Sequence, residues 1–149
     1  MAVKPIPEGY HTVTPYLTVT DAAAQIDFLK RAFGAEEKYR HSDDQGRISH
    51  AEVKVGDSMV MIGQARAEWK PRPSTFYLYV EDIDAVYKQA MASGGKSVRE
   101  PRNEAYGDRS GGVEDNQGNQ WWIATHVEDV SPEEIQRRYA KMAAEAEAK

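Results

Sequence analysis

Two stretches of this sequence decide the fold: Thr14–Asp21, with the sequence TPYLTVTD, and Thr75–Asp82, with the sequence TFYLYVED. In both stretches apolar and polar residues alternate, which is typical of a half-buried strand. Each ends in an aspartate, a residue type that caps helices. Apolar residues then recur at helical spacing, at Ala22, Ile26, Leu29 and Phe33 in the first case and at Ile83, Val86 and Ala90 in the second. Each stretch therefore predicts a strand followed by a helix.

The two strand–helix units lie at one constant offset of 61 residues, from 14 to 75. The same offset relates Tyr16 to Tyr77, and it relates Gly34 to Gly95 after the helices. It also carries Met61-Ile62 onto Trp122-Ile123 near the end of each unit. A spacing kept from the first strand to the last indicates two copies of one structural unit.

Three short extended segments follow each helix, and turn residues such as Asp43-Asp44-Gln45-Gly46 separate them. Their predicted ranges are Glu36–Arg40, Arg47–Val55 and Ser58–Ile62 in the first copy, and Ser97–Glu100, Asp108–Glu114 and Gln120–Thr125 in the second. The fold class is therefore α+β, with two βαβββ modules at about 10–63 and 74–127 in one domain of residues 1–130. The linker, 64–74, is expected to be an exposed crossing. Ser131, Pro132 and Glu134 have the pattern of a helix start, which predicts a C-terminal helix within 131–149.

Composition excludes several classes of protein. The 149 residues contain no cysteine, so disulfides, thiolate metal sites and a cysteine nucleophile are absent. Asp and Glu number 24 against 19 Lys and Arg, which gives a net charge of −5. A nucleic-acid-binding protein usually has a basic excess instead. We find no apolar run of the length that a membrane span needs and no apolar leader at the N-terminus, so we expect a cytoplasmic protein without nucleic-acid or membrane partners.

Several motifs together resemble one known superfamily. They are Thr14–Val19, Phe33-Gly34-Ala35, His50–Ser58, Tyr79–Asp82, Gly107–Asp115 and Gly118–His126. Over residues 10–130 the chain resembles the vicinal oxygen chelate superfamily, which groups glyoxalases, bleomycin-resistance proteins and dioxygenases, and it is most similar to the PhnB-like branch. The resemblance implies a curled mixed β-sheet around a cavity, with helices outside, and a homodimer.

The same resemblance implies metal ligands on the first and last strand of each module, which here are Thr14, Met61, Thr75 and Trp122. Two hydroxyls, a thioether and an indole cannot replace the imidazoles and carboxylates that divalent metals prefer. We therefore expect no metal at these positions and no cofactor. A relocated metal site built from His50, Glu52 and His126 is the remaining alternative.

Strand alternation assigns side chains to the cavity face, because successive residues point to opposite sides of a sheet. Leu17, Val19, Ala51 and Ile123 are expected under the helices. The residues expected at the ligand-binding cavity are Thr14, Tyr16, Met59, Met61, Thr75, Tyr77, Tyr79, Arg109, Gln120 and Trp122. Such a lining suits a small compound with a flat ring or an anionic group. The rings could instead pack on one another or on a second subunit, and Arg109 could form a salt bridge to Asp108 or Glu114.

His50 and Glu52 lie on the same strand face, about 6.5–7 Å apart along the strand. One hypothesis makes His50 a general base that Glu52 orients. The alternative is a purely structural histidine beside a surface glutamate. The glycines of 107–112 lack the Lys-Ser/Thr of a phosphate-binding loop and precede a strand, so they do not indicate phosphate binding.

Three functions remain open at this stage. The first is a metal-independent protein that binds or sequesters a small aromatic or anionic compound. The second is a glyoxalase-like lyase or isomerase that uses His50 and Glu52 as acid and base. The third is an assembly role through the C-terminal helix and dimerisation.

Overall fold

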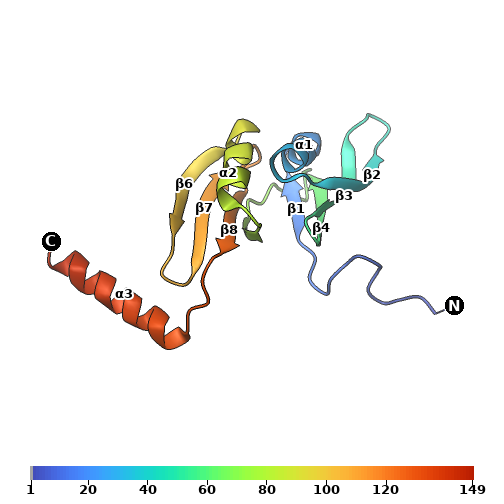
Figure 1. The fold of residues 1–149 in the computed structure, drawn as a ribbon. Coiled ribbons are helices and arrows are strands. Elements are labelled where there is room, and N and C mark those ends of the chain that lie inside the picture. The colour runs from blue at the N-terminus through green and yellow to red at the C-terminus, as the bar shows by residue number, and fades with distance from the viewer. Residues whose placement is uncertain (1) are drawn as a thin grey trace.

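The structure is a computed structural model that describes residues 2–149. Its first module consists of β1 (Tyr16–Val19), α1 (Ala22–Phe33), β2 (Glu36–Ser42), β3 (Ile48–Val55) and β4 (Ser58–Gln64). These strands form one four-stranded sheet in the order β1-β4-β3-β2, with β1 parallel to β4 and the other pairs antiparallel (Figure 1). Asp21 caps α1 by accepting a hydrogen bond from the amide of Ala24 at 3.1 Å.

The second module repeats this order with β5 (Thr75–Tyr79), α2 (Ile83–Ala92), β6 (Lys96–Asn103), β7 (Asp108–Glu114) and β8 (Gln120–His126). Its sheet has the order β5-β8-β7-β6, and β5 is parallel to β8. Asp82 caps α2 through the amide of Ala85 at 3.2 Å, as Asp21 caps α1. The predicted α+β class and the two βαβββ modules are therefore confirmed, and the modules contribute two separate four-stranded sheets.

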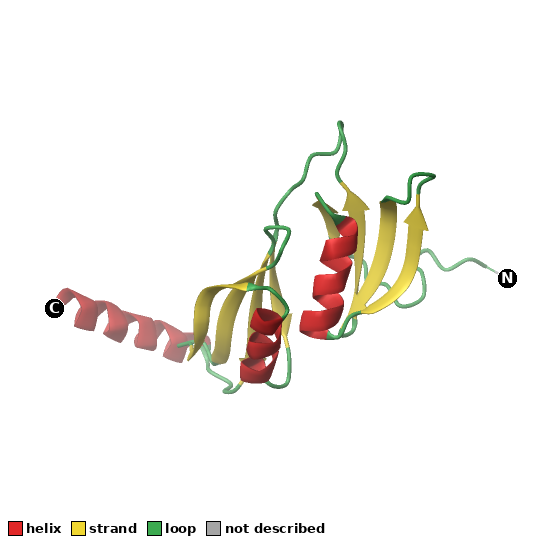
Figure 2. Cartoon of the chain, turned by 90° about the horizontal axis from the view of Figure 1, so that it is seen from above, coloured by secondary structure: helices red, strands yellow, loops and turns green. Residues whose placement is uncertain are grey.

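Each helix covers one face of its own sheet and leaves the opposite face uncovered (Figures 1 and 2). The predicted helix-facing residues are buried: Leu17, Ala51 and Ile123 have no exposed surface, and Val19 has 1%. We call the uncovered faces concave face 1, on the first module, and concave face 2, on the second. Several tyrosines on these faces are exposed, and Tyr16 keeps 52% of its surface accessible.

The two modules contact each other on the helix side. Helices α1 and α2 lie next to each other (Figure 2), and Phe33 packs against Trp121 with ring centroids 5.2 Å apart. Gln25 of α1 donates to the Asp115 carboxylate at 2.9 Å and accepts from the Asn119 amide at 2.8 Å. Because this interface lies behind the sheets, the concave faces are not part of it.

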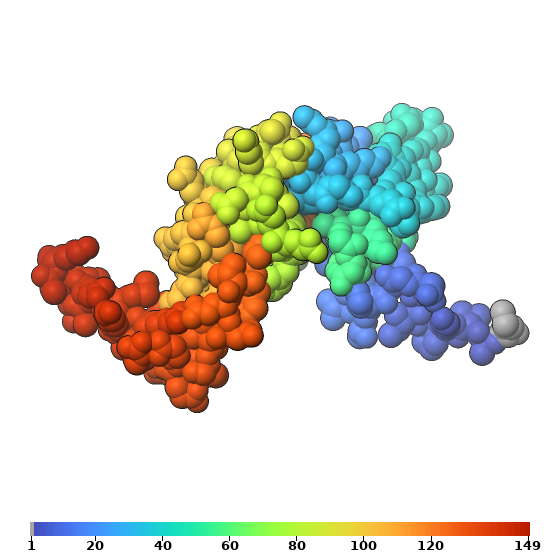
Figure 3. Space-filling view, viewed as in Figure 1, coloured from blue at the N-terminus to red at the C-terminus, as the bar shows by residue number. Residues whose placement is uncertain are grey.

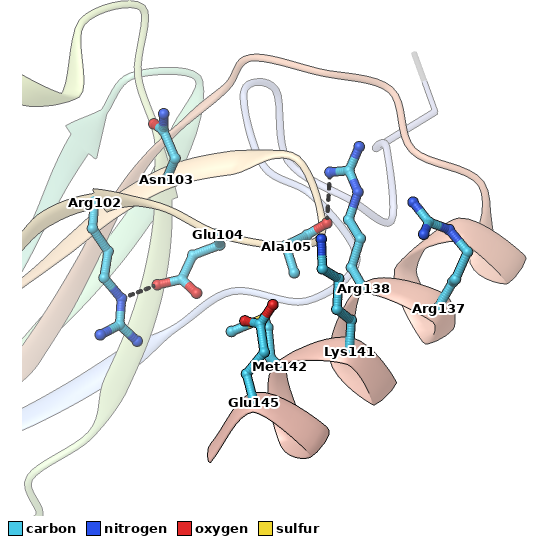
Figure 4. Close-up of a pocket in the computed structure, with 9 residues that line it drawn as sticks. All are labelled: Arg102, Asn103, Glu104, Ala105, Arg137, Arg138, Lys141, Met142 and Glu145. Atoms are coloured by element: carbon cyan, nitrogen blue, oxygen red, sulfur yellow. Dashed lines mark hydrogen bonds and ion pairs between the residues drawn. The ribbon is translucent and has the colours of Figure 1, made fainter. Parts of the chain in front are cut away.

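The C-terminal helix α3 (Pro132–Glu147) extends away from the two modules (Figures 1 and 3). Ser131 caps it by accepting from the amide of Glu134 at 3.2 Å, and none of its residues is buried. Arg138 holds it to the β6–β7 turn through the carbonyl of Ala105 at 3.1 Å, beside a hollow of about 580 Å³ (Figure 4). No helix within residues 2–149 has the length and apolar character to span a membrane.

Candidate functional site

Concave face 1 carries a hydrogen-bonded chain of three side chains. Nε2 of His50 lies 3.1 Å from Oε2 of Glu52, and Nδ1 of His50 lies 3.3 Å from the Tyr16 hydroxyl. A carboxylate only accepts hydrogen bonds, so in the neutral imidazole Nε2 carries the proton and Nδ1 accepts from the Tyr16 hydroxyl. The imidazole is therefore held between a phenol and a carboxylate, with 28% of its side chain exposed.

The remaining predicted residues of the first module lie on β4 and just before β1. Met61 lies opposite Tyr16 in the β1–β4 pair, and Met59 lies two residues before it with 7% of its surface exposed. Thr14 precedes β1 and donates to the carbonyl of His11 at 3.4 Å. Tyr39 of β2 was not predicted, and its ring centroid lies 6.3 Å from that of His50. Concave face 1 is thus polar around His50 and apolar around the two methionines.

Concave face 2 is organised around a buried carboxylate. Asp108 is 2% exposed and accepts hydrogen bonds from the hydroxyls of Tyr77 and Tyr79, each at 2.8 Å. It also contacts Nδ1 of His126 at 2.8 Å. Tyr77 and Tyr79 remain 45% and 61% exposed, so their hydroxyls are fixed while their rings stay accessible.

The electrostatics of this cluster favour an ionised Asp108 and a protonated His126. Burial opposes ionisation, but the hydrogen bonds from His126, Tyr77 and Tyr79 outweigh it and lower the pKa of Asp108. The hydrogen bonds to Asp108 and Asp129 raise the pKa of His126. Burial, with the hydrogen bonds to Tyr106 and Asp108, raises the pKa of Tyr77 above its ordinary value, so its phenol stays protonated.

Trp122 lies beside this cluster, opposite Tyr77 in the β5–β8 pair. The Arg99 guanidinium stacks on the Trp122 ring at 5.0 Å from its centroid. The Trp122 indole donates to Gln120 at 3.3 Å, and Gln120 in turn lies opposite Thr75. Within residues 2–149, Nε of Arg99 is a buried nitrogen without a hydrogen-bond partner.

Arg109 lies away from the other predicted site residues. Its guanidinium donates to both oxygens of Asp84, at 2.8 and 2.9 Å, near the start of α2. Its strand partner Thr125 accepts from the amide of Ile83, which places this pair on the helix side of the sheet. Arg109 is thus held in an ion pair, but its partner is Asp84 of α2 and not the expected Asp108 or Glu114.

The sequence prediction missed Asp108, Arg99 and Tyr106 as parts of the concave surface. Asp108 has the same strand parity as Ser110, Gly112 and the concave-facing Trp122 and His126, so alternation along β7 could have placed it. The irregular register between β6 and β7 leaves no comparable signal for Arg99.

The four positions where the resemblance implies metal ligands do not fit a divalent cation. Their side chains are two threonines, a methionine and a tryptophan, and the tryptophan is covered by the positive guanidinium of Arg99. His50 and Glu52 contact each other on the first module, whereas His126 lies on the second module and contacts Asp108. Residues 2–149 contain no group of three or more His, Asp or Glu side chains suited to holding a metal ion.

Paired βαβββ modules with open concave faces are the fold of a known class of proteins, and comparison with known proteins shows which class this is. The sequence pattern of the Glyoxalase/Bleomycin resistance protein/Dioxygenase superfamily matches residues 10–123, and the chain belongs to that superfamily. An uncharacterized protein of Mycobacterium bovis is 31% identical over 135 residues, which cover 83% of this chain and 89% of that protein.

Solved structures share the fold at lower sequence identity. TioX from Micromonospora sp. ML1 matches with a TM-score of 0.68 and 24% identity over 78% of this chain and 99% of TioX. A PhnB protein from Bacillus cereus matches with a TM-score of 0.62 and 18% identity over 77% of this chain and 96% of that one. These likenesses concern the fold, while function has to be argued from the residues of this chain.

Proposed function

We propose that this protein binds a small aromatic or anionic compound on its concave faces without the help of a metal. The observation that carries the proposal is the pair Tyr77 and Tyr79, whose hydroxyls are fixed on Asp108 while their rings stay 45% and 61% exposed. Rings held in one orientation lose little conformational freedom when a ligand packs on them. Aromatic walls with a few fixed polar groups are typical of small-molecule sites.

A thermal-shift screen over aromatic and anionic compounds tests this proposal. A ligand that binds only the folded protein stabilises it by RT ln(1 + [L]/Kd), about 2.7 kcal/mol at a hundredfold excess over Kd. We expect at least one compound to raise the Tm, and the substitution Tyr79→Ala to abolish the shift. Tyr139→Ala on α3 is the matched control, because Tyr139 is also exposed, at 45%. A screen in which no compound raises the Tm contradicts the proposal.

The second candidate function is acid–base catalysis of the lyase or isomerase type at His50. The observation that favours it is the chain from Glu52 through His50 to Tyr16, at 3.1 and 3.3 Å. Glu52 holds the proton on Nε2 and leaves Nδ1 as the basic nitrogen, which the Tyr16 hydroxyl contacts. A base in this position can remove a proton next to a carbonyl group, directly or through the Tyr16 hydroxyl.

Proton exchange tests the second candidate. The α-protons of a small hydroxyketone such as dihydroxyacetone are followed by NMR in deuterated buffer, with and without the protein. Catalysis predicts exchange faster than in buffer, its loss in His50→Gln, and retention in His11→Gln, which removes an exposed histidine outside this chain of contacts. Exchange at the buffer rate with the wild-type protein contradicts this candidate.

The homodimer and the cytoplasmic location also belong to the proposal. Both concave faces expose large aromatic side chains, and a second copy packed on them would remove that surface from water. Light scattering on the eluting protein measures the oligomeric state directly. A monomeric mass at micromolar concentration contradicts the homodimer. The thermal-shift screen then still tests whether a single chain binds the ligand.

A further inference from the structure

The linker between the modules builds a pocket at one end of concave face 1. The pocket has a volume of about 400 Å³, within the range of small-molecule sites. Its lining residues are Tyr16, Thr18, Ser49, Gly63, Gln64, Arg66 and Trp69. Only Tyr16 among these was predicted as a site residue. We call this site the linker pocket.

The linker is fixed in place by backbone hydrogen bonds. The amide of Arg66 donates to the carbonyl of Trp69 and the amide of Trp69 to the carbonyl of Arg66, both at 2.9 Å. On either side of this turn, the amide of Ala65 donates to the carbonyl of Val19 at 2.7 Å, and the amide of Arg72 donates to the carbonyl of Thr18 at 3.0 Å. The turn that carries Arg66 and Trp69 is therefore tied to β1 at both ends.

Two aromatic side chains give the linker pocket its apolar surface. Tyr16 lies across Gly63, so closely that a Cβ atom at this glycine would be 2.6 Å from the Tyr16 hydroxyl oxygen. The absence of a side chain at Gly63 thus lets the tyrosine ring lie against β4. Trp69 is 60% exposed and Tyr16 is 52% exposed, which leaves ring surface for a planar ligand.

The linker pocket contains one cation, Arg66, for which residues 2–149 supply no ion-pair partner. Arg109 and Arg138 are held by carboxylates, at 2.8 and 2.7 Å, whereas nothing in residues 2–149 forms an ion pair with the Arg66 side chain. The neighbouring Gln64 amide is already engaged, since it accepts from the amide of Ala22 and donates to the carbonyl of Thr20. Arg66 is therefore the group of the pocket that can bind an anion, and a guanidinium matches a carboxylate in a bidentate pair.

We propose that the linker pocket binds a planar aromatic carboxylate, with the ring on Trp69 and Tyr16 and the carboxylate on Arg66. This inference rests on the proposed small-molecule function and adds to it a site on the first module, apart from Tyr77 and Tyr79, with a stated ligand class. It assigns to Arg66 the anion-binding role that the sequence had suggested for Arg109, whose guanidinium is bound to Asp84. A ligand placed here would also contact Tyr16, the residue that touches His50.

Isothermal titration with naphthoate tests the proposal. Naphthalenemethanol keeps the ring without the charge, and cyclohexanecarboxylate keeps the charge without the aromatic ring. We expect naphthoate to bind more tightly than either. Arg66→Met is expected to weaken naphthoate binding about tenfold or more, the effect of a lost hydrogen bond to a charged group. Trp69→Leu is expected to weaken it about fivefold through lost ring contact.

Lys70→Met is the matched control, because it removes one positive charge from the same linker at a residue that does not line the pocket. Affinities within about twofold of wild type are expected for this variant, since an exposed charge outside the site contributes little. Circular dichroism establishes that all three variants are folded. A control that loses as much affinity as Arg66→Met would overturn the proposal, because general charge rather than the pocket would then govern binding.

The two proposals fail in different ways. If naphthoate binds and Tyr79→Ala weakens it while Arg66→Met and Trp69→Leu do not, the linker pocket is wrong and the concave-face function stands. If wild-type protein binds no naphthoate but other compounds raise its Tm, the ligand class is wrong and small-molecule binding stands. Failure of every compound in both assays overturns both.

Discussion

Replacing Gln25 by leucine should strongly destabilise the protein, because this fully buried side chain joins the two modules. Its amide nitrogen donates to the Asp115 carboxylate at 2.9 Å, and its oxygen accepts from Asn119 at 2.8 Å. Trp121 donates to the same Asp115 oxygen at 2.8 Å. Leucine has nearly the same size but no polar atom, so the substitution removes two hydrogen bonds and leaves the cavity filled.

The loss of unfolding free energy can be calculated from the hydrogen bonds that Asp115 and Asn119 lose. Loss of a hydrogen bond to a carboxylate costs about 1.5–3 kcal/mol, and an orphaned buried amide on Asn119 costs about 1–3 kcal/mol. The more apolar leucine returns about 1 kcal/mol through burial. The free energy of unfolding should therefore fall by about 3 kcal/mol. For a chain of this size that corresponds to a Tm lowered by about 10 °C.

Urea unfolding followed by tryptophan fluorescence measures the change. Trp121 is 3% exposed at this interface, so its emission reports on the packing of the modules. Gln89→Leu is the matched control: its amide also bridges the modules, to the carbonyl of Arg31 at 3.0 Å, but at an exposed position. We expect a loss below about 1 kcal/mol there, as for most surface substitutions. A loss for Gln25→Leu no greater than that of the control would refute the role assigned to this buried network.

Three further predictions concern the second module and α3. Gly107→Ala should lower the free energy of unfolding in urea by more than about 2 kcal/mol, because φ is +99° and the new Cβ would collide with the chain that follows β8. The control Gly46→Ala, with φ +80° and open space around the new Cβ, should lower it by less. The pKa of His126, measured by NMR, should lie above the ordinary value of 6.5, Asp129→Asn should lower it, and a pKa at or below 6.5 would contradict this. Because the pKa is raised in the folded state, the stabilising contribution of His126 is complete below the unfolded pKa and disappears as pH rises through the folded pKa. Removal of residues 131–149 should lower the Tm by only a few degrees, because no residue of α3 is buried, and a loss of cooperative unfolding would contradict this.

The fold could be predicted because its signals are local and occur twice. Alternation in Thr14–Asp21 and Thr75–Asp82 fixes which residues face the helices, and the two aspartates fix where the helices begin. Both aspartates accept the predicted type of capping hydrogen bond. Each of these features depends on residues within a few positions of one another, so the sequence is sufficient to predict them.

The candidate site was only partly predictable, because it depends on side-chain geometry between strands. His50 and Glu52 share a face by alternation, but only the structure shows their side chains meeting at 3.1 Å. Arg109 was predicted at the cavity, and the structure places it on the helix side of β7, beside Asp84. Arg66 gave no signal at all, since its position depends on how the linker folds back onto β1.

The order of residues is enough to specify two βαβββ modules, the helix caps, the buried faces of the strands and the absence of metal-ligand chemistry at four family positions. Only the packing of distant segments settles which polar groups meet, and it brings Gln25 to Asp115 and Asn119, and Asp108 to two tyrosines. It leaves Arg66 without a carboxylate partner among residues 2–149. The physical reason is sequence distance. Periodicity and capping act within one turn or one strand, whereas Gln25 and Asp115 are 90 residues apart and become neighbours only when the modules pack.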